Sequence, residues 1–132
     1  MGAEPWEYFV PYQDDIDAVL QALREQEFAA GRFRGSELNP ATIEEAFAAM
    51  EECGTASILD IAHVSDTADF CAVAPLPDEE LVELFGTTEP TRETIQHDMS
   101  FFEDIERGQG VYIIVYNDGQ PSEIFFGGYS FD

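Results

Sequence analysis

The strongest local signal in this sequence is the segment Asn117-Asp118-Gly119, which lies between two runs rich in β-branched and aromatic residues, 111–116 and 123–129. Asn, Asp and Gly tolerate the positive φ angles that the tightest hairpin turns require. The pattern therefore predicts two antiparallel strands joined by a short turn at the C-terminal end of the sequence.

A further strand is predicted near the N-terminus, where side chains alternate in character from Trp6 to Val10 and the pattern ends at Pro11. Ten of the 17 aromatic residues lie within residues 1–12 and 111–132. Because aromatic pairs across neighbouring strands stabilise a sheet, we expect the first strand to pair with the C-terminal hairpin.

Apolar residues spaced three or four positions apart predict four helices, over residues 16–30, 40–53, 77–85 and 90–107. Gly31, Gly86 and Gly108 are suitable ends for three of them. Asn39 followed by Pro40 is typical of an N-cap and a first helical residue, so the second helix is expected to begin there.

Between the helix pairs, residues 56–64 and 70–74 are rich in Ile, Leu, Val and other strand-forming residues, with a polar segment at 65–69. This pattern predicts a second hairpin and the element order β-αα-ββ-αα-ββ. A chain of 132 residues that is 45% apolar suffices for one core. We therefore expect a single α+β domain over residues 1–132, with a largely antiparallel sheet of about five strands and helices mainly on one face.

The charge of the chain restricts its partners. It has 28 acidic residues against five arginines and no lysine, a formal net charge of −23. Such a chain repels phosphates and anionic lipid surfaces and attracts basic proteins and cations. We therefore expect neither nucleic acid nor a membrane as a partner, while the oligomeric state stays open.

The expected location is the cytoplasm. The N-terminal residues lack the basic and apolar pattern of a signal peptide, and the run 111–116 is far too short to cross a bilayer. Cys53 and Cys71 stand 18 residues apart and form no CxxC pair, as is usual for a reduced cytoplasmic protein.

The sequence lacks the motifs of phosphate, zinc, acyl-transfer and calcium sites, so no cofactor or metal is expected, and an enzyme is not the leading hypothesis. The candidate catalytic pair is His63 and Cys71, which would face each other if the second hairpin turned at 65–69. The alternative is that Cys71 is a small packed hydrophobe. Asp60 and Asp69 would complete a metal site only if the hairpin aimed all four side chains at one point.

Two smaller features also have alternative interpretations. Gly127 and Gly128, in the last predicted strand, could leave room for a ligand or for a closely packed neighbour, and close packing is the favoured interpretation. Arg32 and Arg34 could hold an anionic ligand, but pairing with nearby carboxylates is the simpler account.

Acidic residues on the predicted helices are the strongest functional signal. Carboxylates three or four positions apart on a helix stand about 5 to 6 Å apart, close to the phosphate spacing of a nucleic-acid strand. The candidate partner-binding residues are Glu44, Glu45, Glu51, Glu52, Asp78, Glu79, Glu80, Glu83, Glu103 and Asp104.

The leading hypothesis is a non-enzymatic acidic protein that binds a basic protein partner, as immunity proteins, antitoxins and nucleic-acid mimics do. One alternative is a small enzyme or ligand-binding domain with a site at His63 and Cys71. The other is a generally acidic cytoplasmic protein whose charge serves solubility or reflects a high-salt or high-GC origin.

Four segments of the sequence are distinctive: Met1-Gly2-Ala3 with Trp6 and Tyr8, Ser57-Ile58-Leu59-Asp60-Ile61, Phe85-Gly86-Thr87-Thr88-Glu89-Pro90-Thr91, and Glu123-Ile124-Phe125-Phe126-Gly127-Gly128. Through these segments nearly the whole chain resembles a group of small uncharacterised bacterial acidic proteins. The resemblance implies a bacterial, cytoplasmic origin and supplies no activity, cofactor or site residue.

Overall fold

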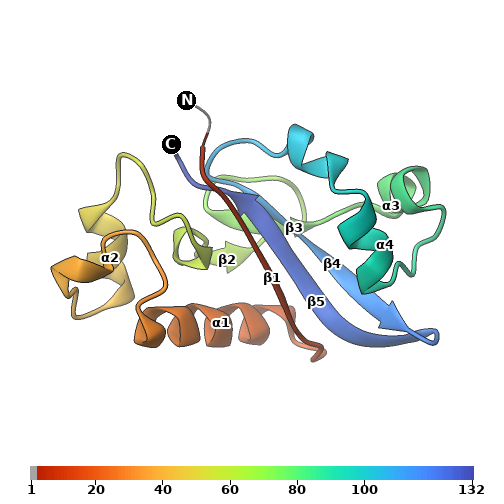
Figure 1. Cartoon of the computed structure of the whole chain (residues 1–132), viewed down its shortest axis with the longest axis horizontal. Coiled ribbons are helices and arrows are strands. Elements are labelled where there is room, and N and C mark those ends of the chain that lie inside the picture. The colour runs from red at the N-terminus through yellow and green to blue at the C-terminus, as the bar shows by residue number, and fades with distance from the viewer. Residues whose placement is uncertain (1–2) are drawn as a thin grey trace.

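The computed structural model describes residues 3–132, which contain one five-stranded sheet in the order β1-β5-β4-β3-β2 (Figure 1). Its strands are β1 (Pro5–Pro11), β2 (His63–Val64), β3 (Ala72–Pro75), β4 (Gly110–Asn117) and β5 (Gln120–Tyr129). The pairs β1–β5 and β4–β5 are antiparallel, whereas β2–β3 and β3–β4 are parallel. The α+β class and the five strands are confirmed, and the sheet is mixed.

The C-terminal hairpin forms as predicted. Asn117 pairs with Gln120, and the two residues between them, Asp118 and Gly119, have φ angles of 53° and 76°. β1 lies beside β5, and the rings of Phe9 and Phe125 pack with their centroids 5.0 Å apart. The predicted pairing of the first strand with the hairpin is therefore confirmed.

The helices are α1 (Ile16–Ala30), α2 (Ile43–Ala49), α3 (Asp78–Phe85) and α4 (Arg92–His97), with short 3-10 helices η1 (Ser36–Leu38), η2 (Ile58–Asp60) and η3 (Ser100–Asp104). The predictions for α1 and α3 are confirmed, since α1 ends before Gly31 and α3 before Gly86, both in the left-handed conformation.

Two helix predictions need correction. The second helix begins after Thr42, whose hydroxyl accepts the Glu45 N–H, whereas Asn39 has a φ of 52° at the end of η1. The predicted fourth helix is broken into α4 and η3. At the break, the Asp98 carboxylate accepts hydrogen bonds from both the backbone N–H and the hydroxyl of Ser100, which compete with continued helical bonding.

Helices cover both faces of the sheet, so the expectation of helices mainly on one face was wrong. One core cluster joins α1 to Ile124 and Phe126 of β5, and the other joins α3, α4 and η3 to Phe125. Consecutive side chains of a strand point to opposite faces, and here both sets are apolar. Each face therefore needs its own cover.

The predicted hairpin over residues 56–74 does not form. The Ser57 hydroxyl accepts the Leu59 N–H and begins η2, while the Asp60 carboxylate accepts the Thr55 N–H. These local bonds draw the segment into a buried turn instead of a strand. Within residues 56–64, His63 and Val64 form the one strand, and they pair with β3 in parallel.

Candidate functional site

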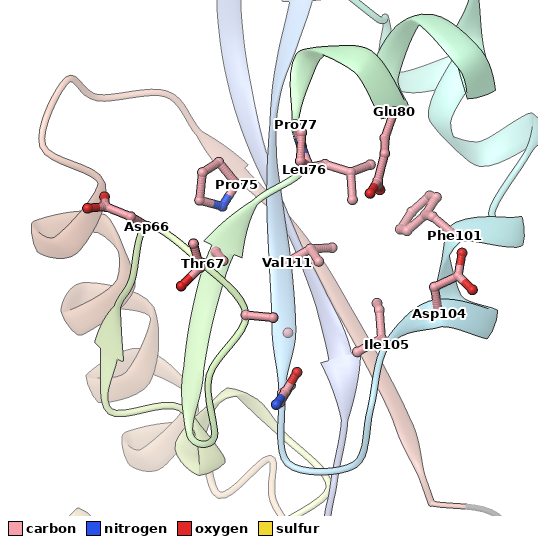
Figure 2. Close-up of a pocket in the computed structure, with 14 residues that line it drawn as sticks. Asp66, Thr67, Pro75, Leu76, Pro77, Glu80, Phe101, Asp104, Ile105 and Val111 are labelled. Atoms are coloured by element: carbon pink, nitrogen blue, oxygen red, sulfur yellow. The ribbon is translucent and has the colours of Figure 1, made fainter.

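A pocket of about 270 Å³ opens beside the parallel pair β3–β4 (Figure 2). Its walls come from these two strands, from the start of α3, from η3 and from the loop after β2. Elements separated along the chain therefore converge on one hollow.

Small residues leave the pocket open. Ala74 of β3 and Gly110 of β4 line it, and a side chain larger than that of Ala74 would fill the space. Packing on the opposite face of the sheet requires glycine at position 110, because an added Cβ would lie 2.9 Å from Cη2 of Trp6 and 3.1 Å from Cγ1 of Val73. Gly110 therefore serves the packing of the opposite face, while the small side chain of Ala74 leaves the pocket open.

The pocket has apolar walls and carboxylates around it. Leu76, Phe101, Ile105 and Val111 line it, with Leu76 and Phe101 buried and the other two half-buried. The exposed carboxylates come from three elements: Asp66 from the loop after β2, Glu80 from α3 and Asp104 from η3. Glu80 and Asp104 lie on either side of Phe101, whereas the carboxylate of Asp66 points away from them (Figure 2). This arrangement suits a cation carried on an apolar stem.

The ten predicted partner-binding residues do not form one acidic face. Glu44 and Glu45 begin α2, and Glu51 and Glu52 follow it, at the opposite end of the molecule from α3 (Figure 1). The other six lie on α3 and η3, and of these Glu80 and Asp104 line the pocket.

Asp66 completes the pocket and was missing from the predicted set. It belongs to the polar segment 65–69, which the sequence pattern marked only as a turn. The parallel pairing of β2 with β3 carries this segment back alongside the sheet, so that Asp66 lines the pocket with its carboxylate directed outward (Figure 2).

The arginines are used elsewhere. Within residues 3–132, the three ion pairs join Arg32 to Glu27, Arg92 to Glu123 and Arg107 to Asp132, so none of them involves the ten predicted acids or Asp66. Pairing with a carboxylate is confirmed for Arg32.

Arg34 departs from that expectation, because its guanidinium donates to the backbone carbonyls of Cys53 and Gly54. It holds together a turn of the main chain, and the expected pairing with a carboxylate was wrong.

The expected register between His63 and Cys71 was also wrong. His63 is exposed and stands opposite Ala72, while Cys71 precedes β3 with a φ of 61°. Burial, then the charges of Asp60 and Asp69, raise the pKa of the Cys71 thiol. A nucleophilic cysteine needs the opposite shift, so the geometry gives the catalytic hypothesis no support.

The metal alternative fails on the same geometry. No group of three or more His, Cys, Asp or Glu side chains within residues 3–132 is placed to hold a metal ion. Asp60 is fully buried and accepts hydrogen bonds from Thr55 and Ser130 instead.

The glycine pair in β5 serves packing. A Cβ on Gly128 would lie 2.6 Å from Cζ2 of Trp6, and one on Gly127 would lie 2.8 Å from Cζ of Phe102. Aromatic rings therefore occupy the space on both faces that a ligand would need, and the favoured interpretation is confirmed.

Comparisons of this chain with models of protein families, with curated proteins and with solved structures find no match. The resemblance to small bacterial proteins therefore stays a prediction. Among the described residues, no helix has both the length and the apolar character that crossing a membrane requires.

Proposed function

We propose that this protein is a non-enzymatic binding protein that engages a basic protein partner through the end of the molecule around the pocket. The pocket face, as we call this surface, comprises Asp66, Asp78, Glu79, Glu80, Glu83, Glu103 and Asp104. The proposal rests on one observation: an apolar pocket opens among carboxylates, and none of these carboxylates takes part in the three ion pairs found within residues 3–132.

The two properties of this face have different roles in binding. Exposed carboxylates on α3 and η3 attract a positively charged surface and accelerate encounter. The pocket supplies an apolar cavity that one partner side chain can fill, and filled cavities of this kind contribute most of the affinity at protein interfaces. An acidic surface without such a cavity would offer attraction but little orientation.

The type of partner follows from the charge. A net charge of −23 favours a strongly basic protein, such as a nuclease or toxin that an immunity protein or antitoxin restrains, or a nucleic-acid-binding protein that a mimic occupies. We further infer a cytoplasmic location, which is supported by the presence of two free cysteines, Cys53 and Cys71.

The test compares two variants that each neutralise four carboxylates. The pocket-face variant carries Glu79→Gln, Glu80→Gln, Glu83→Gln and Asp104→Asn. The matched control carries Glu44→Gln, Glu45→Gln, Glu51→Gln and Glu52→Gln at the α2 end. Each variant and the wild-type chain are immobilised and exposed to lysate of the native host at low and moderate ionic strength.

We expect the wild-type chain and the α2-end variant to retain the same basic protein, with salt releasing it, and the pocket-face variant to lose it. Equal loss by both variants would show that only total charge matters. Retention of no basic protein by the wild-type chain at either ionic strength would refute the proposal.

A further inference from the structure

We infer that the pocket receives an arginine side chain of the partner. The inference rests on the proposed function and names the group that the site recognises. It follows from three properties of the pocket: its volume, the apolar character of its walls and the placement of its carboxylates.

The volume suits one long side chain. Pockets for drug-sized ligands and cofactors usually measure about 300 to 1,000 Å³. At about 270 Å³ this pocket falls below that range. An anionic ligand of the same size would meet repulsion from Glu80 and Asp104, so the occupant must be neutral or positive.

The walls suit an aliphatic stem. The pocket is lined by three aliphatic side chains: Leu76 between β3 and α3, Ile105 after η3, and Val111 of β4. Long basic side chains bury their methylene groups against such surfaces while the charged head stays near water. Glu80 and Asp104 are exposed beside the pocket and can meet that head.

The carboxylates favour guanidinium over ammonium. Glu80 and Asp104 flank Phe101 and come from two different elements, α3 and η3 (Figure 2). A guanidinium has five donors in one plane, so it can bond two carboxylates together, and it stacks on an aromatic ring. It is also more weakly hydrated than an ammonium, which lowers the cost of entering a partly apolar pocket.

The experiment uses the full chain and two uncharged-backbone probes, acetyl-Gly-Arg-Gly-amide and acetyl-Gly-Lys-Gly-amide. NMR titration of the labelled protein gives the affinity for each probe and the residues whose signals shift. We expect shifts at Leu76, Ile105 and Val111, and an affinity for the arginine probe at least about threefold higher than for the lysine probe.

Three variants identify the binding determinant. Glu80→Gln with Asp104→Asn should weaken binding of the arginine probe by about fivefold to tenfold, the value expected for two exposed ion pairs. The matched control, Glu51→Gln with Glu52→Gln, removes the same charge at the α2 end and should change affinity by less than about twofold. Ala68→Phe fills the pocket from an exposed position, keeps every charge, and should abolish the wall shifts.

The outcomes separate this inference from the proposed function. Equal affinity for the two probes would refute an arginine pocket. So would equal losses of affinity in the two double variants that each remove two carboxylates. If the pocket-face variant still loses the basic partner in that case, the proposed function stands and only the identity of the anchoring side chain is wrong. If the arginine probe binds in the pocket but the pocket-face variant retains the partner, the proposed function is wrong instead.

Discussion

Removal of the Ser130 hydroxyl should destabilise the fold far more than removal of a comparable surface hydroxyl. Ser130 follows β5 and is fully buried, and its Oγ donates to Oδ2 of Asp60 at 2.7 Å. The other carboxylate oxygen, Oδ1, accepts the Thr55 N–H at 2.7 Å and the Thr55 hydroxyl at 2.8 Å. One buried carboxylate therefore ties the end of the sheet to η2 and to the turn before it.

The expected magnitude comes from this geometry. A hydrogen bond to a carboxylate contributes about 1.5 to 3 kcal/mol, so Ser130→Ala should lower the free energy of unfolding by about 2 kcal/mol and Tm by roughly 6 to 10 °C. Asp60→Ala removes all three bonds and leaves buried donors without their acceptor, at a cost of about 3 to 5 kcal/mol. The double variant should lose less than the sum, because both single changes break the same bond.

Urea unfolding followed by far-UV circular dichroism, and by the fluorescence of the buried Trp6, measures these losses. The matched control is Ser122→Ala, whose half-buried hydroxyl donates to the Val115 carbonyl at 3.3 Å and should contribute no more than about 1 kcal/mol. A loss for Ser130→Ala no larger than for Ser122→Ala, or strict additivity in the double variant, would refute this account of the buried network.

Three further outcomes are expected. Burial raises the pKa of Tyr8 from 10.0 to about 12, so the neutral phenol stabilises the fold below pH 10. This contribution disappears as the pH rises toward 12. Between pH 9 and pH 11, the urea midpoint should therefore fall less for Tyr8→Phe than for the wild-type chain. Gly128→Ala should cost at least about 1 to 3 kcal/mol in the same unfolding assay, because its Cβ would collide with the Gln109 carbonyl and the Trp6 ring, and a neutral effect would contradict the packing account. Iodoacetamide at pH 7 should label Cys71 more slowly in the folded than in the unfolded chain, since its thiol pKa is raised, and equal rates would reopen the catalytic hypothesis.

The parts of the fold that could be predicted depend on signals between near neighbours. The turn at Asp118-Gly119 joins adjacent strands, and Gly31 and Gly86 end helices directly before them. The prediction failed over residues 56–64, where apolar residues typical of a strand compete with the side-chain acceptors Ser57 and Asp60. Composition favours a strand there, but the buried hydrogen bonds that Asp60 accepts from Thr55 and Ser130 decide the outcome. Ser130 lies 70 residues beyond Asp60 along the chain.

The pocket could not be predicted for a related reason. Glu80 and Asp104 stand out as members of acidic clusters, but nothing in their spacing shows that α3 and η3 flank the same hollow. Asp66 joins them only because β2 pairs with β3 in parallel, which reverses the expected course of the loop. Local charge patterns therefore identified two of the three carboxylates, while tertiary structure determines which of the acidic residues share a site.

The placement of the arginines links the stability of the chain to partner binding. Arg92 lies 4.3 Å above the centre of the Phe9 ring and pairs with Glu123, and Arg32 pairs with the buried Glu27, so these cations strengthen the scaffold away from α3 and η3.

The carboxylates of the pocket face consequently repel one another across distances that salt screens, with a Debye length of about 10 Å at 0.1 M and about 3 Å at 1 M. Salt should therefore raise Tm of the free chain, whereas a bound basic partner should raise Tm most at low salt and progressively less as salt is added. Thermal unfolding of the chain with and without the partner, from about 0.05 M to about 1 M sodium chloride, measures both trends. Parallel trends would mean that the partner does not bind through charge, because only a complex held by these carboxylates weakens under the conditions that stabilise the free protein.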